Sequence, residues 1–397
     1  MSYQNSSITE TTSTSWFTRI KNSVVGVLFG LLLLVAGVVG LFWNEGRAVT
    51  TARSLEEGAG IVMSVAADRV DAANEGKLIH VTGSTTTDSK PSDADFGIVA
   101  TGLRLERTVE MYQWKETSKS ETKEKLGGGT ETVTTYTYST DWSSRPIDSS
   151  RFKQADGHTN PPMSIQSETY QVPAAKLGAF DLSQRVIGMI GGKKPVELTA
   201  DMAPAITDAY AGTRRVAVAD GRIYLGWDYT APRIGDYRIG YSLVPLGPVS
   251  IVGEQRGSGF EPYQTKAGRQ LLMVSEGTVA ADVMFADAIS GNRVLTWILR
   301  LVGLVALFIA FSLVMAPLGV FASVIPFLGN IVRMGTGLVA FALAVLVGAV
   351  TIAIAWFFFR PLLSLGIIVV GAAIAFVALR MARSRQAEAP PADPEPA

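Results

Sequence analysis

The stretch VVGVLFGLLLLVAGVVGLFW, residues 24–43, carries no charged side chain and decides the class of fold. A helix rises about 1.5 Å per residue, so about twenty apolar residues cross a hydrocarbon core of about 30 Å. A cleavable signal peptide is the alternative, because Arg19 and Lys21 precede the run. Its apolar region usually covers only about 7–15 residues before a small-x-small cleavage site. The length of the run therefore favours a helix that stays in the membrane.

Three more apolar runs come after a long polar region, and they predict four transmembrane α-helices with a large β-rich (α+β) extracytoplasmic domain between the first and second spans. Four spans place both termini on one side of the membrane. The predicted segments are a cytoplasmic N-terminal segment at 1–23, spans at 24–43, 294–315, 337–359 and 362–379, the domain at 44–293, an interfacial or re-entrant cytoplasmic segment at 316–336, and a disordered cytoplasmic tail at 380–397.

The distribution of basic and aromatic residues gives the orientation of these spans. Basic residues near the span ends modestly favour a cytoplasmic N-terminus under the positive-inside rule. Tryptophan prefers the membrane interface, and three tryptophans fall at the predicted face opposite the termini. These are Trp43, Trp297 and Trp356.

The polar middle region alternates in the manner of β-strands. Residues 103–116 and 130–142 are rich in Thr, Val, Tyr and Trp, and they predict a long hairpin whose charged tip, residues 117–129, is solvated and mobile. Residues 216–227 predict a second hairpin that turns at Asp220 and Gly221. Residues 235–255 predict two strands broken at Pro245 to Pro248. Helices are expected at 174–190 and 279–289.

Composition excludes several classes of function. The formal net charge is zero, which does not provide the basic surface that nucleic-acid binding needs. Cysteine is absent, so disulfides, thiolate nucleophiles and cysteine-ligated metals are excluded. A large external domain without disulfides, and with its single N-x-S/T sequon at Asn5, inclines the interpretation toward a bacterial envelope protein.

Few residues can carry catalysis. His80 lies in a strand pattern, and His158 lies in the turn-forming sequence DGHTNPP with Asp156 near by. A base or a metal ligand at His158 is conceivable, but turn chemistry explains the same residues. The glycine-rich sequences LGGGT and GGKKP lack the features of a phosphate-binding loop. We therefore expect no enzyme, no catalytic residue, no cofactor and no metal site.

The sequence FWNEGRAVTTARSL, residues 42–55, lies where the chain leaves the first span. Ala48, Ala52 and Leu55 recur at helical spacing, so the helix is expected to continue outward, either as a solvated stalk or as a docking surface. Arg300 is the ionisable residue well inside a predicted span, and snorkelling to the headgroups is its simplest explanation. The candidate interaction residues are Trp43, Asn44, Glu45, Gly46, Arg47 and Arg300.

Six motifs in this order resemble the LUMA family of multi-pass membrane proteins, also called transmembrane protein forty-three. They are FWNEGRAVTTARSLEEG, VEMYQWKE, YTYSTDWSSRPIDSSRF, GHTNPP, PYQTKAG and AWFFFRPLLSL, and the likeness covers about residues 40–380. The resemblance implies a four-span protein with a large luminal domain that self-associates and organises membrane protein complexes. In eukaryotes it implies the endoplasmic reticulum or the inner nuclear membrane.

The leading hypothesis is therefore a non-catalytic scaffold or complex anchor in a membrane, in a bacterial inner (plasma) membrane if the host is a bacterium. Expected partners are membrane lipid, a second copy of the chain and other membrane proteins, but no nucleic acid. An envelope hydrolase with a site near His158 is the first alternative, and a transporter subunit is a weaker one.

Overall fold

The computed structural model describes residues 6–362, 364–366, 369–371, 373–374, 376–377 and 380. Contacts divide the chain into two compact units. Unit 1 comprises residues 1–15, 53–125 and 129–290, and unit 2 comprises residues 16–52, 126–128 and 291–397. Within the predicted fourth span at 362–379, the described residues 362, 364–366, 369–371, 373–374 and 376–377 are helical, and the others lie outside the described residues. The predicted tail at 380–397 lies outside them from residue 381 onward. Both stay predictions.

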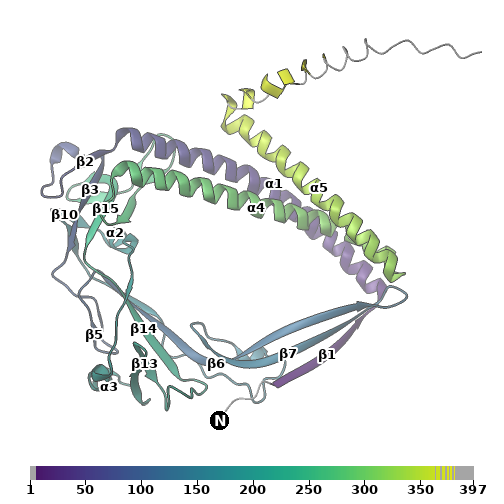
Figure 1. Ribbon diagram of the computed structural model, residues 1–397, viewed down its shortest axis with the longest axis horizontal. Coiled ribbons are helices and arrows are strands. Elements are labelled where there is room, and N and C mark those ends of the chain that lie inside the picture. Colours follow the sequence, from purple (N-terminus) through teal and green to yellow (C-terminus); the bar gives the residue numbers. More distant parts are fainter. Residues whose placement is uncertain are drawn as a thin grey trace, which may run out of the picture. The chain divides into compact units, whose positions relative to one another are not determined.

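Unit 2 contains most of three long helices, α1 (Trp16–Ile61), α4 (Ala281–Ala322) and α5 (Pro326–Phe359), shown in Figure 1. Residues 53–61 of α1 and 281–290 of α4 belong to unit 1. All three are long and apolar enough to cross a membrane. The first three predicted spans lie inside α1, α4 and α5 in turn. The segment at 316–336 is divided between two of these helices, because α4 runs to Ala322 and α5 starts at Pro326. Proline suits a first helical position because it has no N–H to leave unpaired.

Small side chains allow these helices to approach closely. Leu41 of α1, Leu307 of α4 and Ala344 of α5 form one buried apolar cluster. A Cβ atom added at Gly348 of α5 would lie 2.3 Å from the Leu304 side chain of α4. α5 buries the small residues Ala340, Ala344, Gly348 and Ala355, and small side chains permit close helix packing.

Unit 1 contains an eight-stranded sheet with the main order β1-β7-β6-β14-β13-β12, with β8 added on β6 and β11 on β14. Its alternating inward side chains, among them Leu105, Val109 and Ile239, are fully buried. The strand bounds are β1 Ser6–Thr14, β6 Arg104–Glu124, β7 Thr130–Ser143, β8 Glu168–Gln171, β11 Lys194–Pro195, β12 Val216–Ala219, β13 Arg222–Leu225 and β14 Tyr237–Val244.

The predicted hairpins are confirmed, with one correction. β12 and β13 turn at Asp220 (φ 51°) and Gly221 (φ 70°), as the Asp-Gly dipeptide predicts. β6 and β7 pair antiparallel up to Glu124 and Thr130, so residues 117–124 continue a strand and do not belong to the tip that the sequence predicts over 117–129. Hydroxyl pairs such as Ser120 with Thr134, at 2.9 Å between oxygens, extend the ladder through this polar stretch.

The strand β1 was not predicted, and its position bears on topology. Residues Ser6 to Thr14 pair in continuous antiparallel register with β7, from Ser6 opposite Tyr138 to Thr14 opposite Thr130. A strand that precedes one membrane crossing cannot share a sheet with a strand that comes after it, because the bilayer would separate them. The pairing therefore conflicts with a cytoplasmic segment at 1–23 opposite an extracytoplasmic domain at 44–293.

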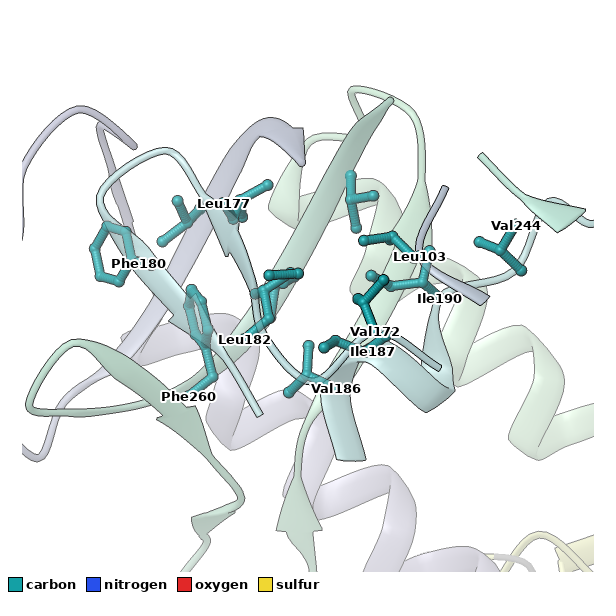
Figure 2. Packing of buried hydrophobic residues seen from close by; sticks show 14 of the residues in the cluster. Leu103, Val172, Leu177, Phe180, Leu182, Val186, Ile187, Ile190, Val244 and Phe260 are labelled. Carbon is teal, nitrogen blue, oxygen red and sulfur yellow. The ribbon is translucent and has the colours of Figure 1, made fainter. Parts of the chain in front are cut away.

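A second, seven-stranded sheet of unit 1 has the order β10-β9-β3-β15-β16, with β19 added on β15 and β2 on β3. Figure 2 shows its core, where Phe180 stacks on Phe260 with ring centroids 5.2 Å apart. The bounds are β2 Met63–Val65, β3 Leu78–Thr86, β9 Ala175–Leu177, β10 Phe180–Leu182, β15 Pro248–Arg256, β16 Gly259–Glu261 and β19 Met273–Glu276. Two small sheets pair β4 (Ser92–Asp93) with β5 (Ile98–Val99) and β17 (Tyr263–Gln264) with β18 (Gln270–Leu271).

The predicted helix at 174–190 is wrong over most of its length. β9 and β10 form a hairpin there, and its turn contains Gly178 at φ 59°. Only α2 (Gln184–Met189) is helical, with the Ser183 side chain accepting from the Val186 amide. Arg104 donates to the carbonyls of Ile187, Gly188 and Ile190 at the other end of α2. The remaining short helix, α3, covers Ala203–Ala209.

The polar continuation of the first span docks within unit 1, which settles the choice between a solvated stalk and a docking surface. Leu55 near the end of α1 packs with Met284 and Phe285 near the start of α4 in a buried cluster. Glu57 accepts hydrogen bonds from the Lys266 and Ala267 amides at 2.9 and 3.1 Å. The expected helix at 279–289 is confirmed from Ala281 onward.

Candidate functional site

Unit 2 contains a polar cluster among its apolar helices, and we call it the interhelical polar cluster. On α4, Asn292, Thr296 and Arg300 recur every four residues, which places them on one helix face. α1 contributes three residues from a single turn, and α5 contributes one tryptophan. The cluster consists of Asn44, Glu45, Arg47, Asn292, Thr296, Arg300 and Trp356.

The centre of the cluster is an ion pair between α1 and α4. Arg300 Nε lies 2.6 Å from Glu45 Oε1, and Arg300 Nη2 lies 2.8 Å from Glu45 Oε2. This two-point geometry is the strong form of an arginine–carboxylate contact. The Glu45 side chain is 0% exposed and the Arg300 side chain is 12% exposed. The expectation that Arg300 snorkels to the headgroups is wrong, because its guanidinium pairs with the Glu45 carboxylate instead.

Tryptophan side chains complete the ion pair. Trp356 of α5 donates its indole N–H to Glu45 Oε2 at 2.9 Å, so the carboxylate joins all three helices. The Arg300 guanidinium lies 4.6 Å from the centre of the Trp297 ring and 5.8 Å from that of Trp356. Trp43, in contrast, remains 61% exposed. Trp297 and Trp356, two of the three tryptophans that the sequence predicts at one membrane face, thus lie beside the Arg300 guanidinium.

Arg47 forms the second half of the cluster. Its guanidinium donates to Asn292 Oδ1 and Thr296 Oγ1, each at 3.0 Å, and to Asn44 Oδ1 at 3.1 Å. Asn44 donates to the Thr296 carbonyl at 3.2 Å, and Asn292 donates to the Ala48 carbonyl at 3.0 Å. The bonds run in both directions between α1 and α4, which fixes the register of the two helices against sliding.

Gly46 brings the end of α5 against α1. A Cβ atom at this position would lie 2.7 Å from the Phe359 ring, so any larger side chain displaces that ring. Phe42 of α1 packs against the Phe358 and Phe359 rings, with centroids 5.9 and 5.2 Å away. Gly46 therefore acts through close packing and contributes no polar group.

The hydrogen bonds of the cluster fit a structural role, which is to hold α1, α4 and α5 in one arrangement. Both Glu45 oxygens accept hydrogen bonds from cationic or indole donors, which leaves the carboxylate poorly placed to take a proton from a substrate. A buried ion pair adds little net stability. Removing one partner, however, leaves the other charge buried and unpaired, which costs about 3–5 kcal/mol. The arrangement thus selects one register of three helices rather than performing a reaction.

Sequence reasoning found part of this cluster. The structure brings Asn44, Glu45, Arg47 and Arg300 together, whereas Gly46 serves packing and Trp43 stays exposed. Sequence reasoning missed Asn292, Thr296 and the indole of Trp356. The spacing of four between Asn292, Thr296 and Arg300 was the available signal, because polar residues on one face of an apolar helix need a partner.

His158, the centre of the hydrolase alternative, is a packed side chain. Its ring stacks on Tyr138 at 4.1 Å and meets the Trp114 ring edge-on at 4.6 Å between centroids. Its Nδ1 lies 3.1 Å from the Gln154 carbonyl oxygen, which accepts the ring N–H. His158 is 7% exposed and Asp156 is exposed. This setting favours a structural role for the ring.

Three apolar helices and a large β-rich unit define a helical membrane protein with a substantial non-membrane part. A family model described as Transmembrane protein 43 matches residues 111–361. The human Transmembrane protein 43 is 31% identical over 379 residues, 92% of both chains. The mouse protein is 32% identical over 87% of each chain, and the Drosophila melanogaster homolog is 29% identical over 87% of this chain and 92% of its own.

The chain belongs to the Transmembrane protein 43 family, which confirms the resemblance to the LUMA family. No solved structure matches it. The human, mouse and fly relatives are animal proteins, so the inclination toward a bacterial host has no support from them.

Proposed function

We propose that this membrane protein is a non-catalytic, multi-pass scaffold that self-associates and anchors other membrane proteins. The observation that supports it is the interhelical polar cluster, in which one carboxylate joins three helices. These contacts hold the three helices in one arrangement, so the outer surface of the helices stays constant. The outer surface is apolar, with Leu28, Leu32 and Val35 of α1 each 60% exposed or more, and it suits lipid or neighbouring helices.

The proposal also concerns the membrane in which the protein resides. The family membership is compatible with the endoplasmic reticulum or the inner nuclear membrane, and a bacterial inner membrane is the alternative for a bacterial host. In either membrane the expected partners are lipid, a second copy of the chain and other membrane proteins. The scaffold does not require a cofactor or a metal.

The alternatives have weaker support. A hydrolase centred on His158 would need that ring to face a substrate, and it is instead covered by Trp114 and Tyr138. A transporter would need polar groups that can exchange partners, but Arg300 and Glu45 neutralise each other. Neither alternative is favoured.

Self-association is tested by co-expressing two copies that carry different affinity tags. The membranes are solubilised in a mild detergent, and one tag is used for purification while the other is detected. We expect both tags in one complex, together with other membrane proteins identified by crosslinking in the intact membrane. Recovery of single-tag, partner-free protein at normal abundance would contradict the scaffold. Arg293→Gln, a change at an exposed residue of α4 outside the polar cluster, is the matched control for variants of Arg300.

A further inference from the structure

The loop between β13 and β14, residues 226–236, has a shape fixed by its own hydrogen bonds. Asp236 accepts from the Tyr224 hydroxyl and from the Arg233 amide, the latter at 2.8 Å. The Asp228 carboxylate accepts from the Thr230 amide and hydroxyl at 2.9 and 2.7 Å. A Cβ atom at Gly226 would lie 2.4 Å from the Asp236 carboxyl carbon, so the loop base also requires glycine.

This ordered loop presents two large aromatic side chains to solvent. Trp227 is 67% exposed and Tyr229 is 54% exposed. Single exposed apolar residues are ordinary on protein surfaces. Two aromatic rings, two residues apart on a loop whose base is fixed, are instead the kind of residue that proteins place at partner surfaces and at membrane interfaces.

Two arginines flank the aromatic pair. Arg215 and Arg233 are exposed, and within the described part of the chain no carboxylate lies within 4.0 Å of either guanidinium. The neighbouring Arg214 is occupied, since it lies over the Tyr237 ring at 5.1 Å and 4.0 Å from Asp236. The one acidic side chain at the loop tip, Asp228, accepts hydrogen bonds from Thr230, and these bonds, together with the nearby charge of Arg215, lower its pKa. The surface thus offers two guanidinium groups to an anion.

We propose that this loop, with Arg215, docks on the headgroup layer of a bilayer that contains anionic lipid. Indole and phenol rings partition to the headgroup region because one end is apolar and the other can hydrogen-bond. Guanidinium groups bind phosphate through two parallel N–H bonds. The chain carries its own apolar helices, so unit 1 is tethered to a membrane and meets lipid at a high effective concentration.

The test uses the natural absence of cysteine, which makes single labels unambiguous. Ala231→Cys, in the exposed part of the loop, is labelled with an environment-sensitive fluorophore in the full-length protein, and Val99→Cys, at a residue 60% exposed on β5, is the matched control. Both are reconstituted in vesicles of phosphatidylcholine with or without phosphatidylserine. We expect the Ala231 label to shift to shorter wavelength and to be quenched by spin-labelled lipid in the anionic vesicles only.

Two double variants then separate the contribution of the aromatic rings from that of the arginines. Trp227→Ala with Tyr229→Ala should abolish lipid quenching, whereas Arg215→Gln with Arg233→Gln should remove its dependence on phosphatidylserine and on salt. Near-ultraviolet circular dichroism verifies that the fold survives each change. Equal quenching of the Ala231 and Val99 labels would overturn the proposal. A label that is shielded only when other proteins are present, and never by lipid, would overturn it too and indicate a protein partner.

Discussion

At the scale of single residues, the Glu45–Arg300 pair shows how a charge can be kept inside an apolar helix bundle. Taking either charged group out of water costs several kcal/mol. This cost is offset because Arg300 donates two hydrogen bonds to the Glu45 carboxylate and Trp356 donates a third. The sequence predicted both residues as interaction sites, but not that they would meet, because they are 255 positions apart.

We expect Arg300→Met to destabilise the protein by about 3–5 kcal/mol, because it leaves the Glu45 carboxylate buried without its partner. The double variant Glu45→Leu, Arg300→Met should recover most of that loss. Thermal unfolding in detergent, read by intrinsic fluorescence, measures the difference. Arg300→Lys serves as the control, since it keeps the charge but loses the second hydrogen bond. A double variant as unstable as the single one would argue against a direct coupling.

A second residue-scale prediction concerns pH. Hydrogen bonds from Arg238, together with nearby Arg222, hold the pKa of the Glu110 carboxyl below its ordinary value of 4.5. A carboxylate with a depressed pKa stabilises the fold above its unfolded pKa, and this contribution is lost as pH falls through the folded one. We therefore expect Glu110→Gln to lower the unfolding temperature at pH 7, with the gap to wild type narrowing below about pH 4.5. A gap that stays constant down to about pH 3 would exclude this role.

At the scale of elements, α1 is a continuous helix that belongs to both units, with residues 16–52 in unit 2 and 53–61 in unit 1. Its middle is therefore where a break should matter most. In the same region, replacement of Arg47 by Glu would destabilise the protein only mildly if Arg47 lay at a wet surface. Because Arg47 donates to Asn44, Asn292 and Thr296, reversal of its charge should instead disrupt the α1–α4 contact.

Ala52→Pro removes a helix hydrogen bond and clashes with the preceding turn, which costs about 3 kcal/mol or more. We expect it to weaken self-association, measured by crosslinking in the native membrane. Glu56→Ala, an exposed site one turn further along, is the control and should change little. Unchanged crosslinking for Ala52→Pro, with expression and fold intact, would show that this part of α1 is a passive tether.

The pairing of β1 with β7 gives the second element-scale prediction. Thr9 lies opposite Thr135 in the antiparallel register. Opposed Cα atoms in such a ladder are about 4.5–5.5 Å apart, within the range of a disulfide. A chain with Thr9→Cys and Thr135→Cys should therefore form an intramolecular disulfide under mild oxidation, seen as a shift on non-reducing gels.

The out-of-register pair Thr9→Cys with Thr137→Cys is the control, and a second in-register pair, Glu10→Cys with Thr134→Cys, tests the neighbouring position. Failure of both in-register pairs to crosslink would show that β1 is not on this sheet in the membrane. The N-terminal segment could then lie on the side opposite the domain, as the basic residues of the sequence predict.

At the scale of the whole molecule, the sequence predicts that the large domain and the C-terminal tail lie on opposite sides of the membrane. The three long helices each contain an apolar stretch long enough to cross a membrane, but their number of crossings and their direction stay predictions. A cysteine at Leu126, which is 88% exposed in the hairpin turn, should react with a membrane-impermeant thiol reagent applied to intact cells or sealed organelles of the appropriate orientation. A cysteine at Ala387 should not react until the membrane is opened. The reverse pattern would invert the predicted orientation.

Some features of the chain could be predicted from the sequence alone. Local chemistry was sufficient for the apolar helices, for the Asp220-Gly221 hairpin and for the strands before and after Pro245, because length, turn residues and two-residue alternation act over short distances. The six motifs, spread over most of the chain, also predicted the family to which the chain belongs. The same local logic failed at 174–190, where apolar residues at mixed spacing fit either a helix or a hairpin.

Only the tertiary structure decided which distant residues meet. Glu45, Arg300 and Trp356 come from three helices, and no local pattern states that an arginine inside one span will find its carboxylate in another rather than the headgroups. The addition of β1 to the sheet likewise depends on a register with β7, which lies far along the chain. Pairings of this kind depend on the packing of whole elements, since each polar group takes whichever partner the fold brings within reach.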